Sequence, residues 1–75
     1  MSEPVIYRWE RVMHKNVRSK DGADVGNIIS EAGDTFTVMQ GASKEYNLPK
    51  SCVEGFNGSE VSLNISYAEV MKYKA

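Results

Sequence analysis

Cysteine, histidine and proline are scarce in this chain of 75 residues, which contains one Cys, one His and two Pro. A single cysteine excludes an internal disulfide, and Cys52 with His14 is too small a set for a structural metal site. The chain therefore lacks the cross-links that often stabilise domains of this size. It needs either a compact barrel-like core or a partner subunit.

Long apolar runs are missing as well. No run approaches the roughly 18 residues of a membrane span, so direct membrane insertion is not expected. The N-terminal residues show no signal-peptide pattern. Together with the lone cysteine, this composition predicts a reducing, cytoplasmic location.

Recognisable catalytic sets are absent from the sequence. Cys52 and His14 form the only thiol–imidazole pair, with no third group and no glycine-rich oxyanion loop. Cys52 is instead expected to be a buried structural thiol. Asp21, Asp24 and Asp34 lie near turns but lack the spacing of a calcium loop. The residues therefore predict no enzyme, no cofactor and no metal.

The net charge of −1 conceals an uneven distribution. Residues 1–20 carry five basic and two acidic groups, a net of +3, whereas residues 21–75 carry four basic and eight acidic groups, a net of −4. We call the basic residues of the first segment the basic strip: Arg8, Arg11, Lys15, Arg18 and Lys20. A basic strip can contact phosphate or an acidic partner, although the negative total makes nucleic acid an unexpected ligand.

Short runs with alternating apolar residues follow one another, separated by turn signals about every 8–12 residues. Phe36 and Val38 point one way in the clearest of them. Strands are expected over residues 13–18, 24–31, 35–40, 45–48, 52–56 and 61–65. This spacing predicts one all-β domain over residues 1–75, a small antiparallel β-barrel of five or six short strands with a short C-terminal helical turn.

Glycine and its neighbours mark the corners. Asp21-Gly22 predicts a turn, and Asn57-Gly58 predicts a hairpin with those two residues as its loop. Gly26 lies inside an expected strand, which indicates a bulge or a sharp bend.

Further signals mark the ends of elements. Pro49 has no N–H for a ladder and is expected at a strand end. Ser66 with Glu69 has the spacing of a capping box, which predicts a helical turn after it. Residues 5–13 fit either a short strand or one amphipathic turn. Trp9 is interpreted as a core lid or dimer contact, with a ligand-stacking platform as the alternative.

Three segments together resemble the PRC-barrel superfamily: "NVRSKDGADVGNII", "GDTFTV" and "EYNLPKSCVEGFNGSEVSLNIS". The resemblance covers about residues 12–70, nearly the whole chain. It is carried by Asp21, Gly22, Val25 and Gly26 in the first motif, Tyr46, Leu48, Pro49 and Val53 in the second, and Gly58, Val61 and Leu63 in the third.

The resemblance implies a small β-barrel whose common theme is protein–protein interaction, often with dimerisation and without a catalytic motif. Such modules occur in the reaction-centre H subunit, in a ribosome maturation factor and in many archaea, where some resemble cell-division adaptors. The chain looks most like the stand-alone archaeal type. It is therefore expected to be a non-enzymatic adaptor or regulatory module, a homodimer that also binds another protein, with a link to archaeal cell division.

A candidate partner-binding surface follows from the apolar residues near both chain ends, the basic strip and the corner at Pro49. The corner is expected to present Tyr46 and Lys50 outward. We expect the N-terminal strip and the C-terminal turn to form the contact surface. The alternative function is an RNA- or ribonucleoprotein-binding accessory factor that uses the basic strip. The candidate residues are Tyr7, Arg8, Trp9, Arg11, Tyr46, Lys50, Tyr67 and Met71.

Overall fold

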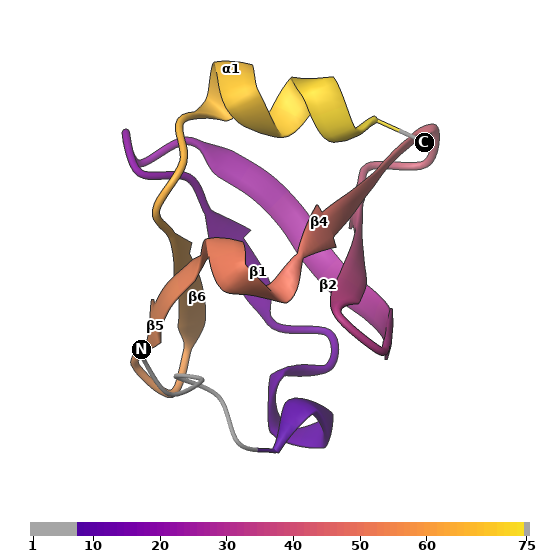
Figure 1. The fold of residues 1–75 in the computed structure, drawn as a ribbon, viewed down its shortest axis with the longest axis vertical. Helices are drawn as coiled ribbons and strands as arrows, with labels where there is room; N and C mark the ends of the chain where they lie inside the picture. Colours follow the sequence, from indigo (N-terminus) through magenta and orange to yellow (C-terminus); the bar gives the residue numbers. More distant parts are fainter. Residues whose placement is uncertain (1–7, 75) are drawn as a thin grey trace.

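The computed structural model describes residues 8–74, which form six short strands and four short helical elements (Figure 1). The strands are β1 (Asn16–Arg18), β2 (Asp24–Ala32), β3 (Thr35–Gln40), β4 (Lys44–Pro49), β5 (Val53–Phe56) and β6 (Glu60–Leu63). The helical elements are η1 (Trp9–Val12), η2 (Lys50–Cys52), α1 (Tyr67–Val70) and η3 (Met71–Tyr73). The prediction of a small, mostly β domain with a short C-terminal helical turn is confirmed.

All six strands belong to one sheet in the order β4-β3-β2-β1-β6-β5. The prediction of a purely antiparallel sheet is wrong at one pair, because β1 runs parallel to β6. Asn16 is opposite Glu60 in this pair, and Arg18 is opposite Ser62. Parallel neighbours need a long crossover connection, and the chain from β2 to β5 provides it.

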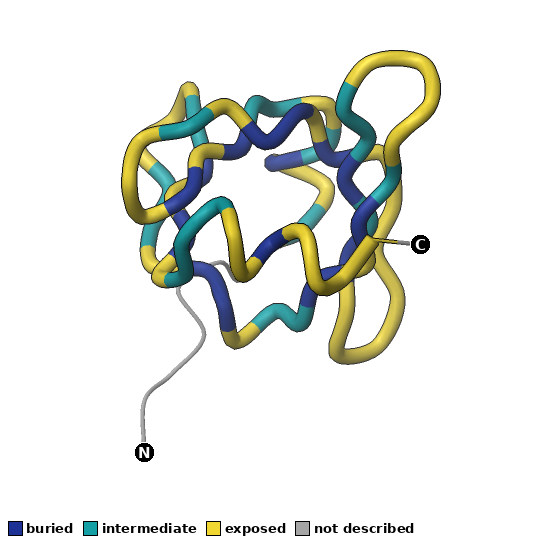
Figure 2. The backbone as a smooth tube through the Cα atoms, turned by 90° about the horizontal axis from the view of Figure 1, so that it is seen from above, coloured by how far each residue is buried: buried dark blue, intermediate teal, exposed yellow. Residues whose placement is uncertain are grey.

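The sheet curls around its interior but does not close into a barrel. Figure 2 shows the backbone running around a central region, with buried and exposed residues interspersed along it. β4 and β5 are the two edges of the sheet order, and the chain passes between them through η2. Pro49 ends β4 at this corner, as predicted. The expected β-barrel is therefore not confirmed, and the six strands form an open, curled sheet.

Two bulges in β2 contribute to the curl. Val25 is left unpaired where the β1–β2 register jumps, and Ile29 where the β2–β3 register jumps. Gly26 lies beside the first bulge with φ +123°, and a Cβ there would lie 2.3 Å from the carbonyl oxygen of Met39. Bulges strengthen the local twist and bend a strand. The bulge predicted at Gly26 is confirmed, and this position requires glycine.

The inner face of the curled sheet holds one cluster of buried apolar side chains. Phe36 and Val38 lie in it together, as their alternation predicts. Cys52 is 7% exposed, so the predicted burial of this thiol is confirmed. The other members are Val12, Val17, Val25, Ile28, Tyr46, Leu48, Val53, Val61, Leu63 and Val70.

Helical turns cover the two ends of the sheet. α1 and η3 lie across one end, at the top of Figure 1, and η1 lies at the opposite end. Val70 and Val12 are buried from these two elements, so each contributes a side chain to the core. Residues 9–12 therefore form the amphipathic turn rather than a strand; residues 1–7 lie outside the described part. None of the helices in residues 8–74 is long and apolar enough to cross a membrane.

The β5–β6 hairpin turns one residue later than expected. The Asn57 N–H donates to the carbonyl of Glu60 at 3.2 Å, so Gly58 and Ser59 are the loop residues. Gly58 has φ +97°, which suits a glycine at the first loop position. The Asn57 side chain accepts hydrogen bonds from the N–H groups of Ser59 and Glu60 instead of occupying the loop itself.

Candidate protein-interaction surface

The expected partner-binding residues divide between the two ends of the molecule. Arg8, Trp9 and Arg11 belong to the η1 end, whereas Tyr67 and Met71 belong to the α1 end (Figure 1). The longest dimension of the described domain, 31 Å, runs vertically in this view. Arg8, Trp9 and Arg11 therefore do not share one continuous surface with Tyr67 and Met71. Tyr7 lies outside the described residues.

Trp9 and Lys50 do come together, at the η1 end. The Trp9 ring lies 5.0 Å from the Phe36 ring, with a tilt of 37°, and is partly buried. The Lys50 ammonium lies 4.7 Å from the Trp9 ring centroid and 2.5 Å from a carboxylate oxygen of Glu31. Trp9 thus covers the core, as a lid does. Lys50 has both an aromatic and an ionic partner, so it is not a free cation at the Pro49 corner.

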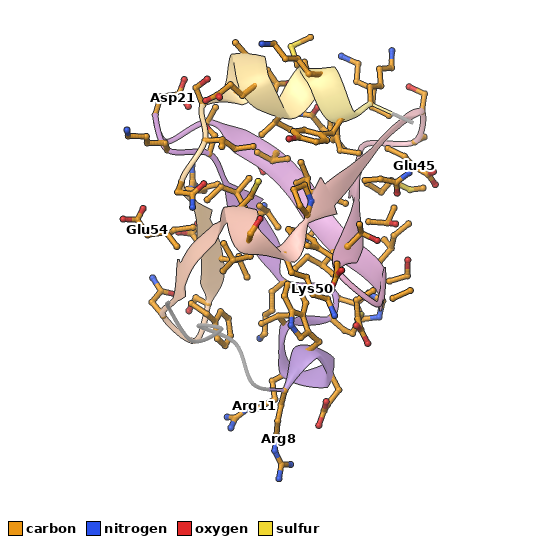
Figure 3. All side chains as sticks on the ribbon, viewed as in Figure 1. Arg8, Arg11, Asp21, Glu45, Lys50 and Glu54 are labelled. Atoms are coloured by element: carbon orange, nitrogen blue, oxygen red, sulfur yellow. The ribbon has the colours of Figure 1, made fainter. Side chains whose placement is uncertain are left out.

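The basic strip does not collect on one face. Arg8 and Arg11 are exposed beside η1, at the bottom of Figure 3. Arg18 is held by Glu60 at 2.7 Å and donates to the Gly22 carbonyl at 3.0 Å. Lys20 lies at the other end, where its N–H donates to the Ile65 carbonyl. Arg8 and Arg11 are therefore far from Lys20, and Arg18 between them is paired with a neighbouring carboxylate.

Tyr46 is buried rather than presented outward, so that expectation is wrong. It is 1% exposed, because it shares the inward face of β4 with Leu48, two residues on. Its hydroxyl donates to Gln40 Oε1 at 2.8 Å, and the Tyr67 hydroxyl donates to the same oxygen at 3.0 Å. Gln40 Nε2 in turn donates to the Asp24 carbonyl. This polar cluster ties α1 to the sheet.

The pKa values of Tyr46 and Tyr67 are shifted in opposite directions. Burial raises the pKa of Tyr46. Hydrogen bonding with the side chains of Tyr46 and Gln40 lowers the pKa of Tyr67; the Lys44 charge acts in the same direction, and burial and the Asp24 charge oppose it. Lys44 begins β4, and Tyr46 of the same strand pairs with Lys74 after η3, so Lys44 lies toward the α1 end of the molecule.

Asp21 is far from α1 in the sequence but lies beside the start of this helix (Figure 3). It accepts hydrogen bonds from the Ser19 hydroxyl and from the Tyr67 N–H, the latter at 3.2 Å. The Ser19 hydrogen bond is the main reason that the pKa of Asp21 is lowered. The predicted capping box is also present, since Ser66 and Glu69 each accept from the other's N–H. α1 is thus a short but firmly held element.

Met71 and Tyr73 are exposed on this firm base. Met71 is 48% exposed and Tyr73 is 41% exposed, and η3 has no buried residue. Lys72 and Lys74 are interleaved with them and are exposed too. The candidate residues included neither these lysines nor Lys44. The mixture of apolar and basic residues in "MKYK" is the sequence feature that indicates an exposed surface here.

Cys52 and His14 lie in different surroundings. Cys52 is buried in η2, and burial, reinforced by the Glu69 charge, raises its pKa. His14 is exposed in the loop before β1, where its φ of +66° is unusual for a residue other than glycine. Within residues 8–74, no group of three or more His, Cys, Asp or Glu side chains could hold a metal ion.

Comparison with known proteins gives no relative: no family model, no curated protein and no solved structure matches the chain.

Proposed function

We propose that this chain is a non-catalytic protein-interaction module, an adaptor or regulatory domain of the PRC-barrel type. The observation that carries the proposal is the exposure of Met71 and Tyr73 on the tightly held α1–η3 cap. Large apolar side chains that stay about half exposed on the surface of their own domain are candidates for contact with a partner.

The polar side chains support an interaction role over a catalytic one. In the described part of the chain, no buried side-chain nitrogen or oxygen lacks a hydrogen-bond partner. Tyr46, Gln40 and Tyr67 satisfy one another, and Lys50 is engaged by Glu31 and Trp9. Polar groups committed to structure in this way are poor candidates for acid–base or nucleophilic chemistry.

The PRC-barrel type is supported by the places that the motif residues occupy. Gly26 permits the close approach of β2 to β3, and Tyr46 with Leu48 fills the interior from β4. Pro49 makes the corner between β4 and η2. We take the open sheet, curled from β4 to β5, as this chain's version of the family's barrel.

Self-association is part of the proposal, because a core built from so few residues gains from a second copy. Light scattering over a wide concentration range is the test. A molar mass that rises toward twice 8.4 kDa is expected. A monomer that persists at the highest concentration would contradict the homodimer while leaving the adaptor role standing.

The adaptor role is tested by capture of partners from a native lysate, followed by mass spectrometry. The native chain is compared with the double variant Met71→Ser/Tyr73→Ser, and Ile29→Ser serves as the matched control. Ile29 is a similarly exposed apolar residue, 37% accessible, on β2 instead of the cap. Proteins retained by the native chain and by Ile29→Ser, but lost with the double variant, are expected. Identical capture by all three would contradict the proposed surface.

A further inference from the structure

We propose that the α1–η3 cap binds an acidic, extended segment of a partner protein that also carries aliphatic or aromatic side chains. The inference rests on the proposed interaction function and adds the chemistry of the partner. Its surface, called the cap surface below, consists of Met71, Lys72, Tyr73, Lys74 and Lys44.

The apolar part of the cap surface is held in place by the elements beneath it. Val70 anchors α1 in the core, and the Tyr67 hydroxyl is fixed by Gln40. η3 then continues directly from α1 without contributing a buried side chain. Met71 and Tyr73 are consequently presented on a rigid support, which reduces the entropy that a partner must overcome on binding.

The basic part of the cap surface comes from two separate segments. Lys72 and Lys74 lie in or after η3, and Lys44 begins β4. The two segments meet, because Lys74 forms an antiparallel bridge with Tyr46 of β4. Lys44 is also close enough to Tyr67 to affect its pKa. Three ammonium groups therefore lie at the same end of the molecule as the exposed apolar side chains.

These three lysines are available for an external carboxylate. No carboxylate in residues 8–74 lies within ion-pair distance of Lys44, Lys72 or Lys74, whereas Arg18 and Lys50 are both paired. Glu69, the acidic residue of α1, is engaged in the capping box. Glu45 is adjacent to Lys44 and forms no ion pair with it. The five residues of the cap surface include three lysines and no carboxylate, a composition that complements an acidic segment.

The charge and shape of the cap surface disfavour a second copy of this chain and a membrane as its occupant. A two-fold contact between two copies at this end would place lysines against lysines, which is unfavourable. An amphipathic membrane-bound helix buries one continuous apolar face. At this end of the described chain, only Met71 and Tyr73 are exposed large apolar side chains, and basic residues flank them. An extended peptide that carries both acidic and apolar side chains can contact both kinds of group.

Selection from a random peptide library displayed on phage tests the proposal without knowledge of the partner. The bait is the full native chain, and the counter-bait is the triple variant Lys44→Gln/Lys72→Gln/Lys74→Gln. All three positions are exposed, so the variant should fold, which circular dichroism verifies. The native chain is expected to enrich peptides rich in Asp or Glu together with Leu, Phe or Trp. The triple variant is expected to lose this enrichment.

The best enriched peptide is then measured by fluorescence anisotropy. Its affinity is expected to fall about tenfold or more in the triple variant, and to decrease with added salt. Met71→Ser/Tyr73→Ser is expected to weaken binding as strongly while leaving the salt dependence in place. Arg11→Gln, an exposed charge at the opposite end, and Ile29→Ser are the matched controls and should bind like the native chain.

Three results would overturn the inference. The first is enrichment of neutral or basic peptides, or an enrichment of acidic peptides that the triple variant retains. The second is an equal loss of affinity in Arg11→Gln. The third is lysine-dependent sedimentation with anionic phosphatidylglycerol vesicles that a selected peptide does not displace. If the peptide selection fails but capture from lysate still depends on Met71 and Tyr73, only the acidic character of the partner is rejected. If both experiments fail, the proposed function is rejected.

Discussion

The Lys50 ammonium lies 4.7 Å from the centre of the Trp9 ring, and this contact joins η2 to η1. Glu31 holds the same ammonium from β2, so three elements meet at one cation. Two rare features of the sequence, the only tryptophan and the corner after Pro49, are therefore parts of one structural cluster.

A double-mutant cycle between Trp9 and Lys50 should detect this contact. Trp9→Leu and Lys50→Met are expected to show a coupling free energy of about 0.5–1 kcal/mol, the usual size of a partly exposed cation–π contact. Trp9→Ala alone should cost about 2 kcal/mol through lost packing on Phe36. Urea denaturation followed by circular dichroism measures both. The pair Trp9→Leu with Arg11→Met is the control, and coupling of the same size there would contradict the assignment.

Gly26→Ala should be among the most damaging single substitutions in the chain. The new Cβ would lie 2.3 Å from the Met39 carbonyl oxygen, at a φ of +123° that side chains disfavour. A loss of about 3 kcal/mol in the free energy of unfolding is expected from the clash and the strain together. Gly55→Ala is the matched control, because nothing lies within 4 Å of its added Cβ. Equal stability of the two variants would refute the close approach of β2 and β3.

Cys52 should react slowly with a thiol reagent in the native protein. It is 7% exposed, and burial raises its pKa, so little thiolate is present at neutral pH. Spectrophotometric titration with a disulfide reagent is expected to show rapid reaction only in denaturant. Rapid stoichiometric labelling under native conditions would mean that η2 opens readily.

Stability should fall in acid partly through Asp21. Its pKa is lowered in the folded state by the Ser19 hydroxyl, so folding favours the carboxylate. This contribution is present above the pKa of about 3.9 of an unfolded Asp, and is lost as the pH falls through the lower folded value. Denaturation midpoints of the native chain and of Asp21→Asn should therefore differ at neutral pH and converge in strong acid. A constant difference down to the lowest pH would show that the carboxylate charge is not involved.

Removal of the Tyr46 hydroxyl should be a mild change. In Tyr46→Phe, Gln40 keeps its hydrogen bond from Tyr67, so a loss of about 1 kcal/mol is expected. Tyr46→Ala should cost about 3–5 kcal/mol, because it empties a buried site. Denaturant melts distinguish the two, and similar values for both would place Tyr46 outside the core.

Local patterns in the sequence predict those features that depend on residues close together in the chain. The alternation of residues 35–40, the bulge at Gly26 and the capping box of Ser66 and Glu69 all depend on short-range geometry, and all three are confirmed. The alternation of Tyr46 with Leu48 was also readable, and it indicates burial of Tyr46. The corner at Pro49 suggested exposure instead, and the period-two pattern proved the better guide.

Contacts between segments that are distant in the sequence cannot be predicted from such local patterns. No local feature shows that β1 pairs with β6 in the parallel sense, or that η1 and α1 cover opposite ends. The separation of the basic strip follows from the same arrangement, since β1 and the turn after it carry Arg18 and Lys20 away from Arg8. Partners of single charges, such as Glu60 for Arg18, are likewise fixed only when distant strands meet.

The parallel pairing of β1 with β6 also constrains the order of folding. Asn16 meets Glu60 and Arg18 meets Ser62, so the first strand can be completed only after the last one has been synthesised. During translation, β1 can pair with β2 but keeps one edge open until β6 leaves the ribosome. Native pairings with such large sequence separation slow folding, because the loop must close before the contact forms. Until β6 has been synthesised and has paired, one edge of β1 therefore stays uncovered.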